Sequence, residues 1–210
     1  MTADATVVRC TPEVTPEEQA RADIYGLLAN LFYAPPSPEL LNAVANAEGV
    51  CDDGAESAFC KTWSALRQAA TDADAACVRD EYDAAFITTG QAPVMLYACF
   101  HLSGRLNDRA VIALRDDLER LGISRRPAAG ETEDHLSALC DVMRMLIAGA
   151  PGMAPAAPQD QHRFFQRHLQ PWYGRVADAI ENAAETHFYK HVGRFARAFF
   201  DLERESLTIE

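Results

Sequence analysis

The stretch that decides the fold runs from Gly130 to Ile147 and reads GETEDHLSALCDVMRMLI. Its apolar residues recur at spacings of three and four, the pattern of a helix with one buried side. They are Leu136, Leu139, Cys140, Met143 and Ile147. Three acids and a histidine, Glu131, Glu133, Asp134 and His135, stand immediately before this pattern. Acids are favourable at a helix start because they face exposed N–H groups and the positive end of the helix dipole. The sequence therefore predicts a buried helix that opens with an acidic rim.

The acidic rim has two interpretations. Most acidic helix starts only stabilise the helix that follows them. The second interpretation is that the rim receives a basic ligand, because carboxylates form strong paired hydrogen bonds with arginine. The rest of the chain is needed to choose between them.

The remaining sequence also predicts helices. A clear start is Thr15-Pro16-Glu17-Glu18, with a Thr cap, Pro at the first position and Glu three residues after the cap. The apolar run Val94–Leu102 is interpreted as a buried helix, and Asn107 as the cap of the next one. No segment alternates with the period of a strand. We therefore expect an all-α fold, a single globular helical domain of about nine or ten helices.

The domain organisation follows from where the helical patterns stop. Residues 1–14 show no periodicity and are expected to form a flexible N-terminal tail. Residues 15–210 are expected to form the all-helical domain. Within it, residues 149–158 read GAPGMAPAAP, a composition typical of a linker.

Composition narrows the classes of partner. The chain has 210 residues, 49% hydrophobic and 24% charged, which is ordinary for a globular protein. Its net charge of −12 argues against binding nucleic acid or an anionic membrane surface. No apolar run is long enough to span a bilayer, so no stable membrane insertion is expected. The negative charge suits a basic peptide partner.

The cysteines indicate a reduced, cytoplasmic protein. The six are Cys10, Cys51, Cys60, Cys77, Cys99 and Cys140. None forms a C-x-x-C pair, so no zinc or dithiol motif is predicted. Cys60, Cys77, Cys99 and Cys140 lie in apolar helical patterns, where free cysteine behaves as a small hydrophobe. The N-terminus lacks the basic and apolar segments of a signal peptide.

The sequence carries none of the common catalytic motifs. The chain has no Gly-rich phosphate loop, no G-x-S-x-G and no H-E-x-x-H. His187 and His191 have the spacing of a metal pair on one helix face, but no third ligand accompanies them. Asp134 and His135 are adjacent, and adjacent residues on a helix do not face each other. We expect no enzyme, no metal and no bound cofactor; a helical metal-dependent enzyme using Asp134 and the histidines stays open as an alternative.

Several motifs resemble those of the TorD/DmsD/NarJ family of cytoplasmic chaperones for molybdenum-cofactor oxidoreductases. Residues 131–136, ETEDHL, resemble the family's E-P-x-D-H-L, with Thr132 in place of the usual proline. Residues 168–172, HLQPW, resemble H-L-x-P-W, and residues 184–189, AETHFY, resemble A-x-x-x-F-Y. Residues 82–86, YDAAF, are a weaker match to Y/W-x-x-L-F. The motifs occur in the family's order and spacing, and the resemblance covers roughly residues 20–205.

The resemblance implies a function. Family members bind the signal peptide, usually with twin arginines, of a molybdoenzyme catalytic subunit and delay its export until the cofactor is inserted. Glu131, Glu133 and Asp134 would then face the arginines. His135 is the fourth candidate at this end of the site, although packing that holds the preceding loop explains this histidine equally well. Tyr82, Phe86 and Trp172 are candidates for the groove that takes the apolar segment of the peptide, although core packing explains these aromatics equally well. A monomer or weak dimer is expected, and a generic helical interaction module is a further alternative.

Overall fold

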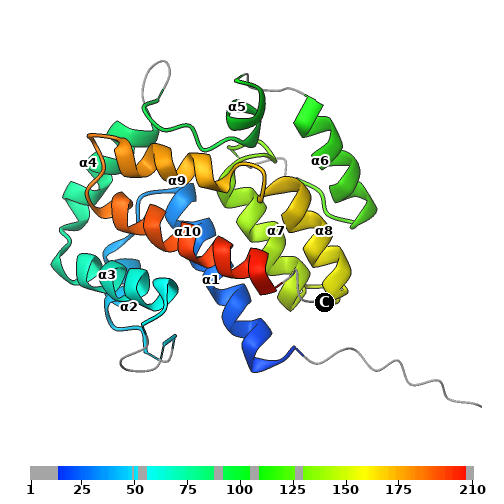
Figure 1. Cartoon of the computed structure of the whole chain (residues 1–210), viewed down its shortest axis with the longest axis horizontal. Coiled ribbons are helices and arrows are strands. Elements are labelled where there is room, and N and C mark those ends of the chain that lie inside the picture. Colours follow the sequence, from blue (N-terminus) through cyan, green and yellow to red (C-terminus); the bar gives the residue numbers. More distant parts are fainter. Residues whose placement is uncertain are drawn as a thin grey trace, which may run out of the picture.

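The computed structural model describes residues 14–48, 50–51, 56–87, 92–104, 109–125 and 130–206. These residues contain ten helices and, outside them, two isolated β-bridges (Figure 1). The predicted all-α fold class is thereby confirmed. In the described part of the chain, no helix combines the length and apolarity that crossing a membrane requires. The predicted tail, apart from Val14, and the predicted cap at Asn107 lie outside the described residues.

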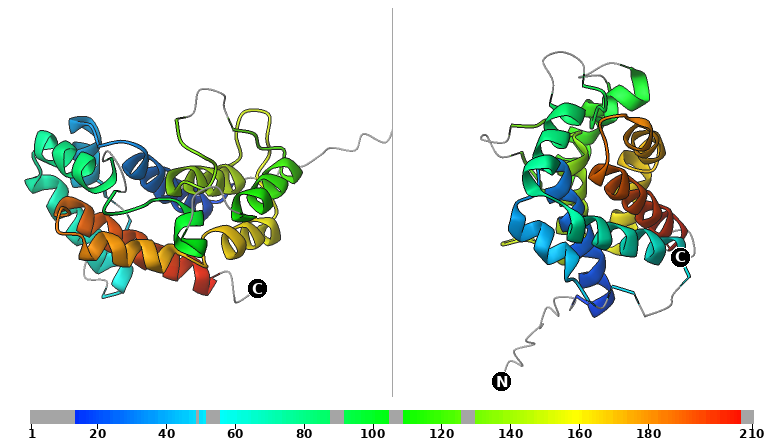
Figure 2. Two further views of the ribbon diagram at one scale, coloured as in Figure 1. Left: turned by 90° about the horizontal axis from the view of Figure 1, so that it is seen from above. Right: turned by 90° about the vertical axis from the view of Figure 1, so that its left-hand side faces the viewer.

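The helix bounds follow the apolar patterns of the sequence. In chain order the helices are α1 (Pro16–Tyr33), α2 (Pro38–Ala45), α3 (Ala58–Asp72), α4 (Ala75–Phe86), α5 (Ala98–Ser103), α6 (Arg109–Arg120), α7 (Leu136–Ala148), α8 (Pro158–His168), α9 (Tyr173–Asn182) and α10 (Phe188–Ser206). Helices α2, α3 and α4 lie at one end of the molecule, and α6 and α8 lie at the other, with α7 between α1 and α8 (Figures 1 and 2). Helix α10 runs between the two ends and packs against α3 and α9.

Helices α1 and α7 form the most extensive helix pair. Helix α1 begins with the predicted capping box, in which the Thr15 hydroxyl accepts from the Glu18 N–H and the Glu18 carboxylate accepts from the Thr15 N–H. A Cβ atom added at Gly26 would lie 3.1 Å from the Cδ of Arg144. The absence of a side chain at Gly26 therefore allows α7 to approach α1 closely.

The end of α1 and the start of α10 are held by side chains from other helices. The hydroxyls of Tyr82 and Tyr189 donate to the backbone carbonyls of Phe32 (3.2 Å) and Leu31 (2.9 Å). The buried carboxylate of Glu81 accepts from the first two N–H groups of α10, those of Phe188 (3.0 Å) and Tyr189 (2.7 Å). Helix ends leave such groups without intrahelical partners, so these contacts join α1, α4 and α10.

The start of α7 differs from the prediction. The helix begins at Leu136 with His135 as its N-cap, and its first turn holds no acid, so the prediction of an acidic first turn is wrong. The cause is an antiparallel bridge between Tyr97 and His135, which keeps the preceding residues out of the helix. The prediction of one helix over Val94–Leu102 is also wrong. Helix α5 begins only at Ala98, and residues 94–97, which include the bridged Tyr97, precede it.

The segment 149–158, predicted as a linker, connects α7 to α8 through a hydrogen-bonded turn. The N–H groups of Ala150 and Met153 donate to each other's carbonyls over 2.9 and 2.8 Å. Gly149 and Gly152 adopt positive φ values of 77° and 81°, which favour glycine. Met153 packs against the core.

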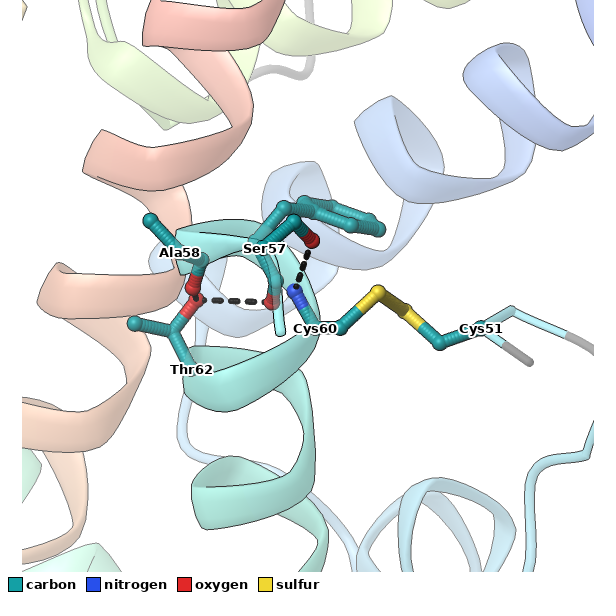
Figure 3. The surroundings of a disulfide bond; sticks show 6 residues. Cys51, Ser57, Ala58, Cys60 and Thr62 are labelled. Carbon is teal, nitrogen blue, oxygen red and sulfur yellow. Dashed lines mark hydrogen bonds between the residues drawn. A yellow bond between two sulfur atoms is a disulfide. The ribbon is translucent and has the colours of Figure 1, made fainter. Parts of the chain in front are cut away.

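Two cysteines form a disulfide that the sequence analysis did not predict. Cys51 and Cys60 are bonded with their Cα atoms 5.8 Å apart (Figure 3). The expectation of reduced thiols is wrong for this pair, and Cys60 is not a free apolar side chain. The pair does not have C-x-x-C spacing, because its members are nine residues apart and meet only between α2 and α3. Ser57 caps α3 there by accepting from the Cys60 N–H over 3.1 Å (Figure 3).

Candidate functional site

Asp134 joins the start of α7 to the start of α5. Its carboxylate accepts from the Cys99 N–H (3.1 Å), and its backbone carbonyl accepts from the Ala98 N–H (3.0 Å). The next residue but one, Leu136, donates to the carbonyl of Leu96 over 2.8 Å. Only 3% of Asp134 is exposed. Its charge therefore caps the first turn of α5 from outside that helix and does not face solvent.

Thr132 gives the Asp134 carboxylate a second donor. The Thr132 hydroxyl donates to the Oδ1 of Asp134 over 2.6 Å. This residue is the one that replaces the usual proline of the family motif. A proline has no hydroxyl, so the substitution supplies a hydrogen bond that proline could not.

His135 caps α7 with an imidazole nitrogen. Its Nδ1 accepts from the Ser137 N–H (3.3 Å) and lies 2.7 Å from the Ser137 hydroxyl. Burial lowers the pKa of His135, while the charges of Glu131 and Asp134 act in the opposite direction. A neutral ring is also what the cap requires, because a protonated Nδ1 could not accept.

Of the three acids predicted to form the rim, Glu131 and Glu133 remain partly accessible and Asp134 is buried. From here on, the acidic rim means Glu131 and Glu133 only. Glu131 is half-buried and accepts a hydrogen bond from the Tyr97 hydroxyl. Glu133 receives both the Nε (3.2 Å) and the Nη2 (3.1 Å) of Arg115, a bidentate pair. Burial acts to raise the pKa of Glu133, but the contact with Arg115 outweighs it and the pKa is lowered. Both rim carboxylates thus already bind a donor of this chain.

An open pocket of about 360 Å³ lies beside Glu133. It is lined by Arg115, Leu118, Glu119, Gly122, Ile123, Ser124, Arg125 and Glu133. The end of α6 shapes it: Gly122 has φ 69°, its N–H donates to Glu119 (3.0 Å), and the Ile123 N–H donates back to Leu118 (2.9 Å). This Schellman turn brings Ile123 onto Leu118. The pocket therefore combines an apolar lining with charged groups.

The HLQPW motif holds α5, α6 and α8 together. The Nε2 of His168 lies 2.7 Å from the Asp117 carboxylate on α6, and both side chains are buried. The Trp172 indole donates to the His168 carbonyl over 2.6 Å and stacks against His101, which precedes it by 71 residues and lies on α5. Burial lowers the pKa of His168, although Asp117 opposes this shift, so the neutral imidazole donates to the carboxylate. Next to His168 is a small cavity of about 70 Å³, which Asp134 also lines.

The three aromatics predicted for a groove are buried. Tyr82, Phe86 and Trp172 are 3%, 9% and 1% exposed. Tyr82 and Phe86 pack with Tyr189 of α10, with ring centroids 5.6 and 4.9 Å apart. The structure brings Glu131, Glu133, Asp134 and His135 together at one place, whereas the side chains of Tyr82, Phe86 and Trp172 belong to the core.

Sequence reasoning missed Arg115, Tyr97, Leu118 and Ile123. The only available signal for Arg115 was an arginine on a helix that leads towards the rim, and spacing cannot pair residues 18 positions apart. The possible metal pair is also changed by the structure, since His187 precedes α10 and does not share a helix face with His191. Among the described residues, no three His, Cys, Asp or Glu side chains are grouped as metal ligands.

Comparison with known proteins gives a solved structure with the same fold and a matching family. No curated protein sequence matches the chain significantly. The crystal structure of a protein from Archaeoglobus fulgidus, assigned as a redox enzyme maturation protein, has a TM-score of 0.57 and 18% sequence identity. The match covers 91% of this chain and 95% of that chain, and at this identity it shows a shared fold.

The all-helical fold is therefore that of a protein assigned to redox enzyme maturation. The family model described as nitrate reductase delta subunit matches residues 52–178. The chain belongs to this family. The resemblance to the TorD/DmsD/NarJ chaperones is confirmed, because the family model is of the NarJ/TorD type.

Proposed function

We propose that this protein is a cytoplasmic chaperone that binds the twin-arginine signal peptide of a molybdoenzyme catalytic subunit. In this role it assists cofactor insertion and delays export, without catalysis and without a cofactor of its own. Membership of a redox enzyme maturation family supports the class of function. The observation that carries the peptide proposal is the acidic rim, Glu131 and Glu133, beside an open pocket with an apolar lining.

The rim suits the charged part of such a peptide. A carboxylate that already accepts two parallel N–H groups from Arg115 is oriented for a guanidinium. Two carboxylates on one short segment match two adjacent arginines in number and charge. The net charge of −12 adds a long-range attraction for a basic peptide.

The pocket suits the apolar part of the peptide. Ile123, which is half-buried, provides apolar surface next to Glu133 at the end of α6, beside the buried Leu118. The buried aromatics Tyr82, Phe86 and Trp172 would have to leave the core to touch a ligand, which would cost several kcal/mol each. We therefore assign the apolar contact to the pocket and give these aromatics the role of shaping the helices around it.

A titration tests the function. A synthetic peptide with two adjacent arginines followed by an apolar segment should bind, and replacing both arginines by lysine should weaken binding because lysine cannot make the bidentate contact. Raising salt should lower the affinity, since exposed charge pairs are screened within about 10 Å at 0.1 M. Equal affinity for both peptides at every salt concentration would rule out recognition of the arginines.

The pocket has its own test. Ile123→Ser should weaken peptide binding because it removes an apolar contact. The control is Leu202→Ser, which removes an apolar side chain that is 48% exposed on α10 and should leave peptide binding unchanged. Equal effects of the two substitutions would contradict the assignment of the apolar contact. Stoichiometric zinc or iron in the purified protein would contradict the whole proposal and favour a metal-dependent enzyme.

A further inference from the structure

One ion pair of this chain reproduces the contact that the client peptide would make. Arg115 reaches Glu133 from α6 with two parallel N–H···O bonds of 3.2 and 3.1 Å. The Arg115 side chain is 55% exposed, whereas that of Glu133 is 14% exposed. The carboxylate is thus fixed near the surface, and the guanidinium on it reaches out to solvent.

We propose that Arg115 is an internal competitor that occupies the guanidinium site on Glu133 and is displaced when a client arginine binds. This inference rests on the proposed function and adds how the same site is controlled. While Arg115 is in place, Glu133 presents little free charge to solvent. A peptide with a single basic residue must displace Arg115 to gain one contact, whereas a peptide with two arginines and an apolar segment gains further contacts that offset the displacement.

The energetics allow the exchange. Ion pairs with an exposed partner contribute little to stability, usually less than about a fivefold change in an equilibrium constant. Breaking the Arg115 contact therefore costs a client little, and the client supplies an equivalent bidentate contact. The geometry also leaves room for the displaced side chain, because Arg115 is already 55% exposed and can move into solvent.

The test compares arginine variants for affinity to the twin-arginine peptide. Arg115→Gln removes the competitor, and Arg115→Lys keeps the charge but removes the fork. The matched control is Arg163→Gln, because Arg163 is 65% exposed and forms an ion pair with Asp160 on α8, away from Glu133. Arg115→Gln should bind about two- to fivefold tighter than wild type, Arg115→Lys should gain less, and Arg163→Gln should match wild type.

A second readout reports on Glu133 directly. The Arg115 contact lowers the pKa of this carboxyl, so the pKa should rise in Arg115→Gln and fall again when the peptide is added. Carboxyl NMR titration measures both steps. A peptide that binds without lowering this pKa is not on Glu133.

The outcomes separate this inference from the proposed function. Weaker binding by Glu133→Gln, with no gain in Arg115→Gln over Arg163→Gln, overturns the competitor and leaves the peptide site intact. Unchanged binding by Glu133→Gln removes the peptide from this carboxylate and overturns both. If the wild type binds no peptide, binding by Arg115→Gln alone supports the competitor, and no binding by either protein overturns it.

Discussion

At the scale of single residues, the Asp134–His135 pair is a structural junction. Asp134 caps α5 from outside, and His135 caps α7, so the two adjacent residues fix the starts of two helices. The sequence identified the positions but grouped Asp134 with Glu131 and Glu133 in one rim of three acids. The burial of Asp134 depends on Cys99, 35 residues earlier in the chain, and no local pattern shows that contact.

We predict that Asp134→Asn lowers stability by about 1–3 kcal/mol, the usual cost of an unsatisfied buried hydrogen-bonding group. An amide offers one oxygen where the carboxylate accepts from both Thr132 and the Cys99 N–H. Thermal unfolding should show a midpoint lowered by on the order of 2–12 °C. Asp83→Asn, an exposed acid on α4, serves as the control. Equal midpoints for the two variants would mean that Asp134 is not held as described.

His135 should make stability depend on pH. Its pKa is lowered in the folded protein, so the unfolded chain takes up a proton first as the pH falls. The stability from this group is present above its unfolded pKa of about 6.5 and is lost as the pH falls from there towards the folded pKa, by up to about 1.4 kcal/mol per pH unit. His101, His168 and His191, whose pKa values are also lowered, add to the slope.

His135→Asn tests this assignment, because asparagine can cap a helix and does not titrate. Denaturant unfolding between pH 7 and pH 5.5 should give a shallower fall for the variant than for wild type. Parallel curves would show that His135 is not the titrating cap.

At the scale of elements, the helices could be predicted because each buries one side, which leaves a period of three to four residues in the sequence. The joints between helices could not be predicted. The carboxylate of Glu81 accepts from the first N–H groups of α10 across 107 residues, and the Cys51–Cys60 bond spans the α2–α3 connection. Such contacts depend on how the elements pack, so spacing alone does not show them.

Glu81→Gln should loosen the start of α10. Each carboxylate oxygen of Glu81 accepts one hydrogen bond, from the N–H of Phe188 or of Tyr189, whereas glutamine has a single accepting oxygen. The negative charge near the helix N-terminus is also lost. We expect a loss of about 1–2 kcal/mol in urea unfolding and faster amide exchange at residues 188 and 189. Asp80→Asn, an exposed acid on the same helix, should leave exchange there unchanged. Equal protection in both variants would contradict the cap.

Opening the disulfide should destabilise the fold. Cross-linking residues nine positions apart lowers the conformational entropy of the unfolded chain. In the chain-entropy model this stabilises the folded state by about 2–3 kcal/mol. The double variant Cys51→Ser/Cys60→Ser should unfold at correspondingly lower denaturant concentration, and a thiol reductant should have the same effect on wild type. Cys77→Ser, at an exposed free cysteine, is the control. Wild type that is insensitive to reductant would show that the bond contributes nothing.

At the scale of the whole molecule, the fold brings a short acidic segment and the end of α6 together at one surface. The sequence predicted Glu131 and Glu133 because they are close to each other in the chain. It could not predict Arg115 or the pocket, which exist only because α6 packs beside the segment before α7. The proposed function therefore requires that this surface, and not the negative charge of the molecule in general, receives the client.

The most direct test is a calorimetric titration of the twin-arginine peptide against two variants that remove the same charge. One is Glu131→Gln/Glu133→Gln, which neutralises the acidic rim. The other is Asp80→Asn/Asp83→Asn, which neutralises two exposed acids on α4. We expect at least about a tenfold loss of affinity for the rim variant, the size expected for lost charged hydrogen bonds, and little change for the α4 variant. Equal affinities for the two variants would contradict the proposed function.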